Sequence, residues 1–357
     1  MFRMRSRALT LAATLAFAFS ASVCHSHAQQ TTLPLWPHVT PEPPQTTEPE
    51  SDATKPTDGT ISGHRTSRLT NITTPTLSVY PPPSTHNTHT AALVFPGGGY
   101  QILAWDGEGL DVCRWLNAVG MTCLLVKYRV PEQGHYPTNP ADLEDAQQAM
   151  RLARFHALDW HIDPNHIGVI GFSAGANLAA LLSTHPDDTH VESTPAAAEA
   201  DTHIDARPDF AILGYPAYLA VSPDQLTLDP IYTPNQFTPP TFLIQAEDDK
   251  GYGKNALVYY RALLDANIPS DLHYFATGGH GFGVFPIDKP ETNWTQLATT
   301  WLRSIHMLPP PPPHTAPNPT VGGTGVPCPI PQPPPSGRPT NASSNTSVTT
   351  TTDPNCW

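Results

Sequence analysis

The sequence predicts an α/β fold in which helices cover both faces of one mostly parallel β-sheet. Between residues 64 and 307, short apolar segments alternate with amphipathic ones, and parallel strands require helical crossovers of this kind. The strand segments are apolar throughout, as expected where both faces of a sheet are buried. A stretch of this length suits a single domain.

The predicted elements follow a regular order after an irregular start. Residues 69–80 are rich in β-branched side chains and predict one or two edge strands, broken at Pro75 because proline cannot donate to a central ladder. The strands expected after them are 91–95, 121–128, 166–171, 210–213, 242–245 and 272–275. The expected helices are 110–119, 141–157, 174–183, 256–266 and 294–306. In a parallel sheet, reacting groups collect at the carboxyl ends of the strands.

Both ends of the chain differ from this pattern. Residues 1–28 carry three arginines, a short apolar run and a Ser-His-Ala exit, which predicts a signal peptide cleaved near Ala28 and a secreted or periplasmic protein. The apolar run falls short of the roughly 20 residues of a membrane-spanning helix, although a membrane anchor is the alternative. Residues 29–63 and 308–357 are rich in Pro and Thr and predict a disordered linker and a disordered tail.

Charge and cysteine content restrict the partners and the compartment. The formal charge is −13, and loss of the three leader arginines would make it −16. Such a surface disfavours nucleic acid and polyacidic substrates and favours neutral or esterified small molecules. Cys113 and Cys123 lie in apolar surroundings and are expected to be core thiols. Cys328 and Cys356 flank the last tail segment, and an exported protein could pair them.

A G-x-S-x-G pentapeptide, Gly-Phe-Ser-Ala-Gly, surrounds Ser173 at the point where the predicted strand 166–171 turns into the helix 174–183. This turn is so tight that the flanking residues must be small, and it holds the serine hydroxyl out above the sheet edge. The motif predicts that Ser173 is a nucleophile. The alternative is a glycine-rich turn whose serine only caps the helix.

A nucleophilic serine needs fixed donors for the negative charge that develops on the attacked group. A run of three glycines follows directly on the predicted strand 91–95, so its N–H groups can face the same edge as Ser173. We expect Gly98 or Gly99, together with the N–H of Ala174, to form an oxyanion hole. A phosphate-binding loop is the alternative, but no Gly-Lys-Ser or Gly-Lys-Thr follows.

The serine also needs a base and an acid that orients the base, in the chain order Ser, Asp, His. His280 follows the predicted strand 272–275 within a Gly-Gly-His-Gly segment, whose glycines give the imidazole room to reach Ser173. The acid is expected in the loop after strand 242–245, where Asp248 and Asp249 stand side by side. Either aspartate could instead be the N-cap of the next helix.

Taken together, these motifs resemble the secreted carbohydrate-esterase branch of the α/β-hydrolases, which includes acetyl-xylan esterases and feruloyl-esterase-like proteins. The resemblance covers about residues 70–307. It rests on seven short segments, namely 96–100 (PGGGY), 106–109 (DGEG) and, shortly after it, 115–117 (WLN), then 127–130 (KYRV), 171–175 (GFSAG), 245–249 (QAEDD) and 278–281 (GGHG).

The resemblance implies the α/β-hydrolase fold and a serine esterase that acts on a small ester or an acetylated oligosaccharide without a metal or an organic cofactor. The family acid is the second Asp of its ADD-like loop, which falls on Asp249. The chain departs from the family in two places. Residues 250–253 (KGYG) stand where Pro and Val often follow the acid, and Phe95-Pro96 stands where a His often precedes the glycine run.

The predicted reaction is acyl transfer to water, with His280 as the base. Because that imidazole must be neutral and an unperturbed histidine titrates near pH 6.5, activity is expected to fall on acidification through that region. A compact oxyanion loop and the lack of a recognisable lid favour short acyl groups such as acetyl. Tyr100, Trp105 and Tyr215 are the candidate wall residues of the pocket.

Three alternatives stay open from the sequence. A serine peptidase of the prolyl-oligopeptidase kind shares this fold and triad order, but it usually carries an additional propeller domain. A catalytically silent carbohydrate-binding or surface protein would not need all of these groups. A metal site at His185, Asp187, Asp188 and His190 is the third alternative, although a polar surface loop is expected there. The sequence does not indicate an oligomeric state.

Overall fold

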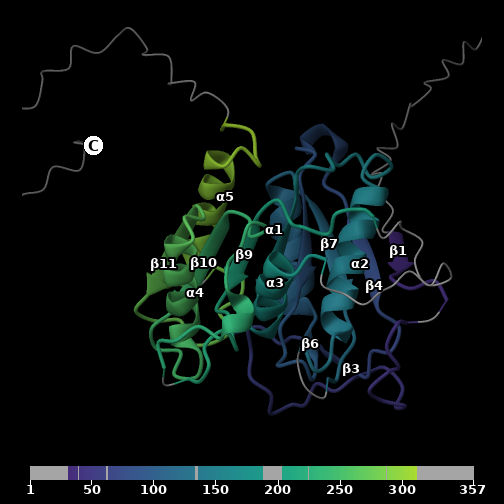
Figure 1. Ribbon diagram of the computed structural model, residues 1–357, viewed down its shortest axis with the longest axis horizontal. Coiled ribbons are helices and arrows are strands. Elements are labelled where there is room, and N and C mark those ends of the chain that lie inside the picture. Colours follow the sequence, from purple (N-terminus) through teal and green to yellow (C-terminus); the bar gives the residue numbers. More distant parts are fainter. Residues whose placement is uncertain are drawn as a thin grey trace, which may run out of the picture. The chain divides into compact units, whose positions relative to one another are not determined.

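The computed structural model describes residues 31–311 except 39, 62, 133–135, 188–202, 224 and 287. An eight-stranded sheet has the order β1-β4-β7-β5-β8-β9-β10-β11 (Figure 1). Its strands are β1 (Thr31–Pro34), β4 (Thr76–Tyr80), β7 (Thr122–Lys127), β5 (Ala91–Phe95), β8 (Ile167–Phe172), β9 (Ala211–Gly214), β10 (Thr241–Ala246) and β11 (Ser270–Phe275). The pairs β1–β4 and β4–β7 are antiparallel, and every later pair is parallel. The predicted sheet is therefore confirmed as mostly parallel.

Helices pack on both faces of this sheet, as predicted. They are α1 (Asp111–Ala118), α2 (Ala141–Phe155), α3 (Ala174–Thr184), α4 (Gly253–Asp265) and α5 (Trp294–Ser304). The buried residues form two clusters, because successive side chains of a strand point to opposite faces. One cluster joins the sheet to α2, α3 and α4, and the other joins it to α1 and α5. Each face of the sheet thus has its own core.

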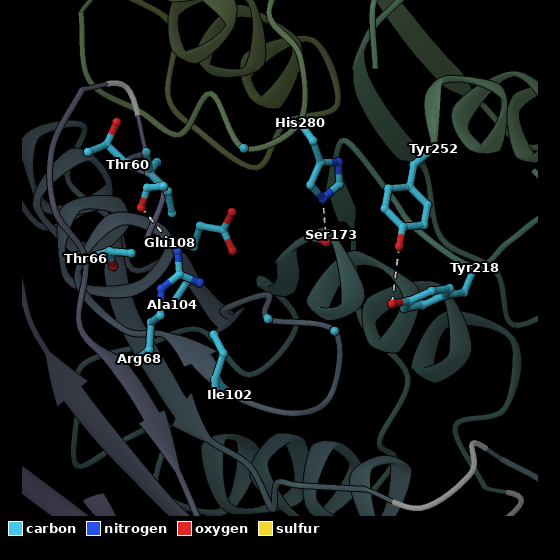
Figure 2. A pocket seen from close by; sticks show the side chains of 15 residues that line it. Thr60, Thr66, Arg68, Ile102, Ala104, Glu108, Ser173, Tyr218, Tyr252 and His280 are labelled. Carbon is cyan, nitrogen blue, oxygen red and sulfur yellow. Dashed lines mark hydrogen bonds between the residues drawn. The ribbon is translucent and has the colours of Figure 1, made fainter. Parts of the chain in front are cut away.

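Shorter elements decorate this framework. In the described part of the chain, the 3-10 turns are η1 (Ser84–His86), η3 (Pro230–Tyr232) and η4 (Pro290–Asn293), and a π-helical turn, η2 (Asp106–Leu110), leads into α1. A second sheet combines β2 (Ser51–Asp52), β3 (Arg68–Thr70) and β6 (Leu103–Ala104). Figure 2 shows Arg68 of β3 and Ala104 of β6 on the side of the pocket opposite the tyrosines. The small sheet therefore supplies one wall of the pocket described below.

The disordered linker predicted for residues 29–63 is wrong for the described part of that segment. Strand β1 pairs antiparallel with β4, and Leu35 is fully buried. The indole N–H of Trp36 donates to Asp145 Oδ1 over 2.7 Å. The Pro-rich composition misled the prediction because a strand that joins the edge of an existing sheet needs few apolar residues of its own. The ordered chain consequently begins well before residue 64.

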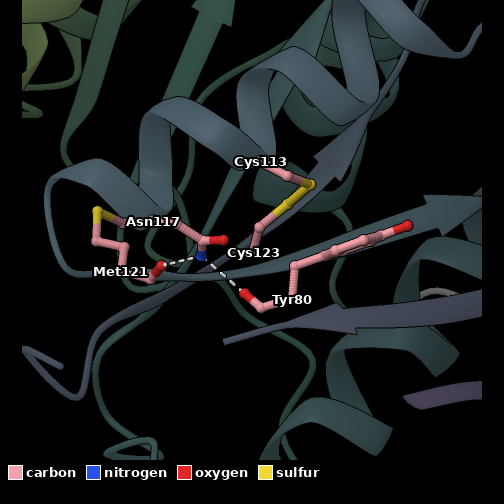
Figure 3. The surroundings of a disulfide bond; sticks show 5 residues. All are labelled: Tyr80, Cys113, Asn117, Met121 and Cys123. Carbon is pink, nitrogen blue, oxygen red and sulfur yellow. Dashed lines mark hydrogen bonds between the residues drawn. A yellow bond between two sulfur atoms is a disulfide. The ribbon is translucent and has the colours of Figure 1, made fainter. Parts of the chain in front are cut away.

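The prediction that Cys113 and Cys123 are core thiols is also wrong in part. Both residues are buried as expected, but their sulfurs form a disulfide that joins α1 to β7 (Figure 3). The side chain of Asn117, one turn further along α1, donates to the carbonyl oxygens of Tyr80 and Met121. Helix α1 and strand β7 lie side by side here, so the two cysteine Cα atoms are 5.0 Å apart. The spacing of the two cysteines in the sequence does not reveal this proximity.

Some predictions fall on residues outside the described part of the chain. They are the signal peptide at 1–28, the tail beyond Pro311, the pair Cys328 and Cys356, and the loop positions Asp188 and His190. By its internal contacts, the chain divides after Pro310 into two units. Among the described residues, no helix is long and apolar enough to cross a membrane.

Candidate active site

Ser173 occupies a strained turn between β8 and α3. Its backbone has φ +53°, in the left-handed region that L-residues rarely adopt. Two glycines make the turn possible: a Cβ atom on Gly175 would lie 2.0 Å from the carbonyl oxygen of Phe95, and one on Gly171 would lie 2.1 Å from that of Gly175. The Ser173 side chain makes no capping hydrogen bond to α3. The alternative of a helix-capping serine is therefore wrong.

The structure brings Ser173, His280 and Asp249 together in one hydrogen-bonded row. Ser173 Oγ lies 2.7 Å from His280 Nε2, and His280 Nδ1 lies 2.7 Å from Asp249 Oδ2. Figure 2 shows the serine and the imidazole pointing toward each other. An ionised carboxylate can only accept, so Nδ1 carries the hydrogen and Nε2 is left to accept from the serine hydroxyl.

Asp249 is held as a carboxylate by four donors. Besides His280, the side chain of Gln245 donates to Oδ2, while the backbone N–H groups of Gly251 and Tyr252 donate to Oδ1. Burial alone would favour the neutral acid, but these hydrogen bonds and the nearby imidazole outweigh it and lower the pKa of Asp249. The departure from the family loop at 250–253 thus provides donors to the acid.

Asp248 contacts a different atom of the histidine loop. Its Oδ1 accepts from the backbone N–H of Gly279 over 2.6 Å, and its side chain is exposed. Its hydrogen bond does not involve the imidazole of His280. Neither aspartate is a helix N-cap, because that position of α4 belongs to Tyr252. Of the two candidates, only Asp249 lies in line with His280 and Ser173.

The predicted oxyanion donors lie at the same edge of the sheet. Gly98 has φ +137° and Gly99 has φ +62°, and a Cβ on Gly98 would lie 2.0 Å from the carbonyl oxygen of Ile102. Within the described residues, the N–H groups of Gly98, Gly99 and Ala174 have no backbone acceptor. The N–H of Gly97, in contrast, donates to Glu108 Oε2 over 2.8 Å. Gly98, Gly99 and Ala174 therefore offer the free donors.

A cavity of about 350 Å³ opens above Ser173 and His280 (Figure 2). The three wall residues predicted from the sequence do not line it: Tyr100 and Tyr215 are fully buried, and Trp105 packs against the core. These predictions are wrong because, outside regular elements, no periodicity shows which way a side chain faces. The side chains that do form the walls include Thr60, Ile61, Thr66, Arg68, Ile102, Tyr218 and Tyr252.

Two of the wall residues are tyrosines. The hydroxyl of Tyr252 donates to that of Tyr218 over 3.4 Å, and the ring of Tyr252 lies 4.9 Å from the imidazole of His280. Tyr218 stacks on the buried ring of Tyr100, with 6.3 Å between the ring centroids. The predicted Tyr100 thus supports the pocket from behind. Burial raises the pKa of Tyr218 to about 12, so its hydroxyl stays protonated.

Sequence reasoning also missed two charged residues of the pocket. Arg68 approaches it from β3, where its guanidinium lies 3.1 Å from Asp58 Oδ2 and donates to the carbonyl oxygen of Gly59. Glu108 lies behind the glycine loop with 4% of its surface exposed. Burial raises the pKa of the Glu108 carboxyl, although hydrogen bonds from Tyr215 and Gly97 act against it. The 106–109 motif pointed to this residue without giving it a role.

The described residues contain no group of three or more His, Cys, Asp or Glu side chains that could hold a metal ion. His185 and Asp187 belong to the described chain, and the ring of His185 packs against Tyr136. The geometry at Ser173 is that of an acyl-transfer site that works through side chains and backbone donors.

The chain is similar to known hydrolases over most of its described length. The BD-FAE family model matches residues 77–214. An acetylxylan esterase of Xylanibacter ruminicola is 30% identical over 233 residues, which are 59% of this chain and 44% of that protein. Endo-1,4-beta-xylanase B of Butyrivibrio fibrisolvens is 30% identical over 210 residues, 54% of this chain and 32% of the xylanase. The chain thus spans less than half the length of these two curated relatives.

A solved structure covers the chain more fully. The acetyl ester-xyloside bifunctional hydrolase from Caldicellulosiruptor lactoaceticus is 30% identical, with a TM-score of 0.58. The match covers 78% of this chain and 97% of that one.

Proposed function

Because the chain belongs to the α/β-hydrolase carbohydrate esterases, we propose that it hydrolyses short-chain esters, with acetyl as the preferred acyl group, on plant polysaccharide such as xylan or its oligosaccharides. The row of Ser173, His280 and Asp249, with two separations of 2.7 Å, carries this proposal. It provides a nucleophile and a base that line one cavity, and a buried acid that orients the base.

The geometry supports a two-step mechanism. As Ser173 Oγ attacks the ester carbonyl, its proton passes to Nε2 of His280, and the imidazolium is stabilised by Asp249. The N–H groups of Ala174 and of Gly98 or Gly99 stabilise the oxyanion. The imidazolium then gives its proton to the departing alcohol, leaving an acyl-serine. Water repeats the sequence and releases the acid.

The cavity supports a short acyl group and a sugar alcohol. Its volume of about 350 Å³ is near the lower end for small-molecule sites, roughly 300–1,000 Å³. If a sugar ring shares this space, the acyl group must be short. Tyr218 and Tyr252 present aromatic rings with polar tips to the cavity, and such groups suit a ligand that is apolar on its faces and polar at its edges.

We also propose that the protein is exported. The leader-like residues 1–28 support this, and so does the disulfide between Cys113 and Cys123, since stable disulfides are typical of oxidising compartments. A fusion of residues 1–28 to a reporter enzyme that works only outside the cytoplasm tests it. Reporter activity that requires the leader is expected, and equal activity without the leader would refute export.

The esterase proposal is tested with the wild-type protein and Ser173→Ala. Hydrolysis of p-nitrophenyl acetate and release of acetate from acetylated xylan are expected from the wild type, and about 10⁵-fold less from the variant. Rates should fall along the series acetate, butyrate, octanoate. Faster cleavage of a peptide anilide than of any ester would instead favour the peptidase. A wild type that neither turns over esters nor reacts with an organophosphonate would favour the silent binding protein.

A further inference from the structure

A buried carboxylate connects the two loops that flank Ser173, and the two-step mechanism does not use it. Glu108 Oε2 accepts from the N–H of Gly97, and Oε1 accepts from the hydroxyl of Tyr215 over 2.9 Å. The Tyr215 oxygen in turn accepts from the N–H of Gly283 over 3.3 Å. One carboxylate thus lies between the glycine loop after β5 and the loop that carries His280.

We propose that Glu108 is a positioning residue for ester hydrolysis, which fixes the oxyanion donors and the imidazole relative to Ser173. This inference rests on the proposed function and goes beyond it, because it assigns a role to a side chain outside the triad. Glu108 acts through Gly97 and Tyr215 rather than by contact with the reacting atoms.

On the oxyanion side, Glu108 fixes the orientation of the glycine loop. A Cβ atom on Gly97 would lie 2.7 Å from Glu108 Oε2 and 2.8 Å from Ser173 Cβ, so the loop is pressed between these two residues. The carboxylate binds the N–H of Gly97 and so fixes the plane of the Pro96–Gly97 peptide, one peptide before the one that carries the N–H of Gly98. The next N–H groups can then face the cavity, where oxyanion donors must stand within about 3 Å of the developing charge.

On the histidine side, Glu108 acts on the loop of His280 through Tyr215, both by the ring of that tyrosine and by its hydrogen bonds. The ring of Tyr215 packs edge-on against the imidazole of His280, with centroids 5.3 Å apart, and against Phe282 at 4.7 Å. Since its hydroxyl is held by Glu108 and by the N–H of Gly283, the ring cannot move away from the imidazole without breaking a buried hydrogen bond. Glu108 therefore also limits the movement of the imidazole.

The charge of Glu108 gives the proposal a separate signature. The titratable and charged groups that act on this carboxylate are Tyr215, His280 and Arg68, from three different parts of the chain. A negative charge near the imidazole favours the imidazolium. Removing that charge should make protonation of the imidazole harder, which a change of packing alone would not do.

The test compares three variants with the wild type on p-nitrophenyl acetate. Glu108→Gln keeps the size of the side chain but removes its charge and one acceptor. Tyr215→Phe keeps the ring and removes the hydroxyl. Glu144→Gln is the matched control, because Glu144 is also a buried carboxylate, but it pairs with Arg129 rather than with Gly97 or Tyr215. Organophosphonate titration gives the number of working sites in each preparation, so every kcat is expressed per titrated serine.

For Glu108→Gln we expect kcat per site to fall about 10- to 100-fold, KM to change less than about threefold, and the acid limb of the pH–rate profile to move to lower pH. Tyr215→Phe should lower kcat less and leave the acid limb in place, and Glu144→Gln should change neither. A Glu108→Gln variant with wild-type kcat per site, or with an unmoved acid limb, overturns the proposal. A wild type without esterase activity would instead refute the proposed function.

Discussion

Replacing Asp249 with Asn is expected to lower kcat by about 10⁴-fold, which corresponds to about 5 kcal/mol in the barrier. The carboxylate Oδ2 lies 2.7 Å from Nδ1 of His280 and keeps the hydrogen on that nitrogen. An amide nitrogen in this place would favour the tautomer with hydrogen on Nε2, which could no longer accept the proton of Ser173. An amide oxygen would keep the tautomer but lose the charge that stabilises the imidazolium.

Asp248 provides the matched control on the neighbouring residue. Its only described hydrogen bond is the one from the N–H of Gly279, and an Asn side chain keeps an oxygen for that contact. Because the residue is exposed, Asp248→Asn should cost less than about tenfold in kcat. Both variants are assayed on p-nitrophenyl acetate, with circular dichroism and thermal melting to compare folding. A larger loss in Asp248→Asn than in Asp249→Asn would refute the assignment of the acid.

Three further predictions concern stability. Burial raises the pKa of Glu132 from 4.5 to about 8. Between these two pH values the folded protein keeps a proton that the unfolded chain has lost. The free energy of unfolding should therefore fall as the pH rises from 4.5 to 8, by up to about 5 kcal/mol. In urea melts at pH 5 and pH 8.5, the free energy of unfolding of Glu132→Gln should change less with pH than that of the wild type. An equal change in both proteins would assign the effect to another group. The double variant Cys113→Ala/Cys123→Ala should lose about 3 kcal/mol and about 6–10 °C in Tm, and an unchanged Tm would contradict this. Trp36→Phe removes a donor from the buried Asp145 and should cost about 1–3 kcal/mol in urea melts, whereas a linker residue would cost nothing.

Much of the fold could be predicted because its strands and helices are bounded by clear signals. The strand at 91–95 coincides with β5, and the helix from Ala141 begins where an Asn-Pro pair stops the preceding segment. The parallel order follows, since a helix separates most of the apolar strands from the next; between β9 and β10 the described part of the connection contains only the 3-10 turn η3. The three loops that meet at Ser173 all follow strands of this sheet, so their convergence could also be predicted.

The pocket walls could not be predicted in this way. Tyr215 and Tyr218 are three residues apart in a loop after β9, and only the later one faces the cavity. Both have positive φ, so the backbone turns at each, and neither helical nor strand periodicity applies. The Thr60 and Arg68 side of the pocket was missed for another reason. It comes from a polar segment that is ordered by contacts with distant residues, and composition does not report such contacts.

The site contains three carboxylates. The family resemblance favoured Asp249 over Asp248 and gave Glu108 no role, whereas the structure ranks all three by the atom that each one reaches. Asp249 reaches the imidazole nitrogen of His280. Glu108 reaches the N–H of Gly97 and the hydroxyl of Tyr215, whose ring packs against His280, and Asp248 reaches the backbone N–H of Gly279. Loss of charge should therefore lower kcat most at Asp249, less at Glu108 and least at Asp248. This order follows from geometry rather than from burial, since Glu108 and Asp249 are similarly buried, with 4% and 5% of their surfaces exposed. If burial alone decided the losses, the variants at 108 and 249 would be equal. A difference of two orders of magnitude or more between them is the consequence of direct contact with the base.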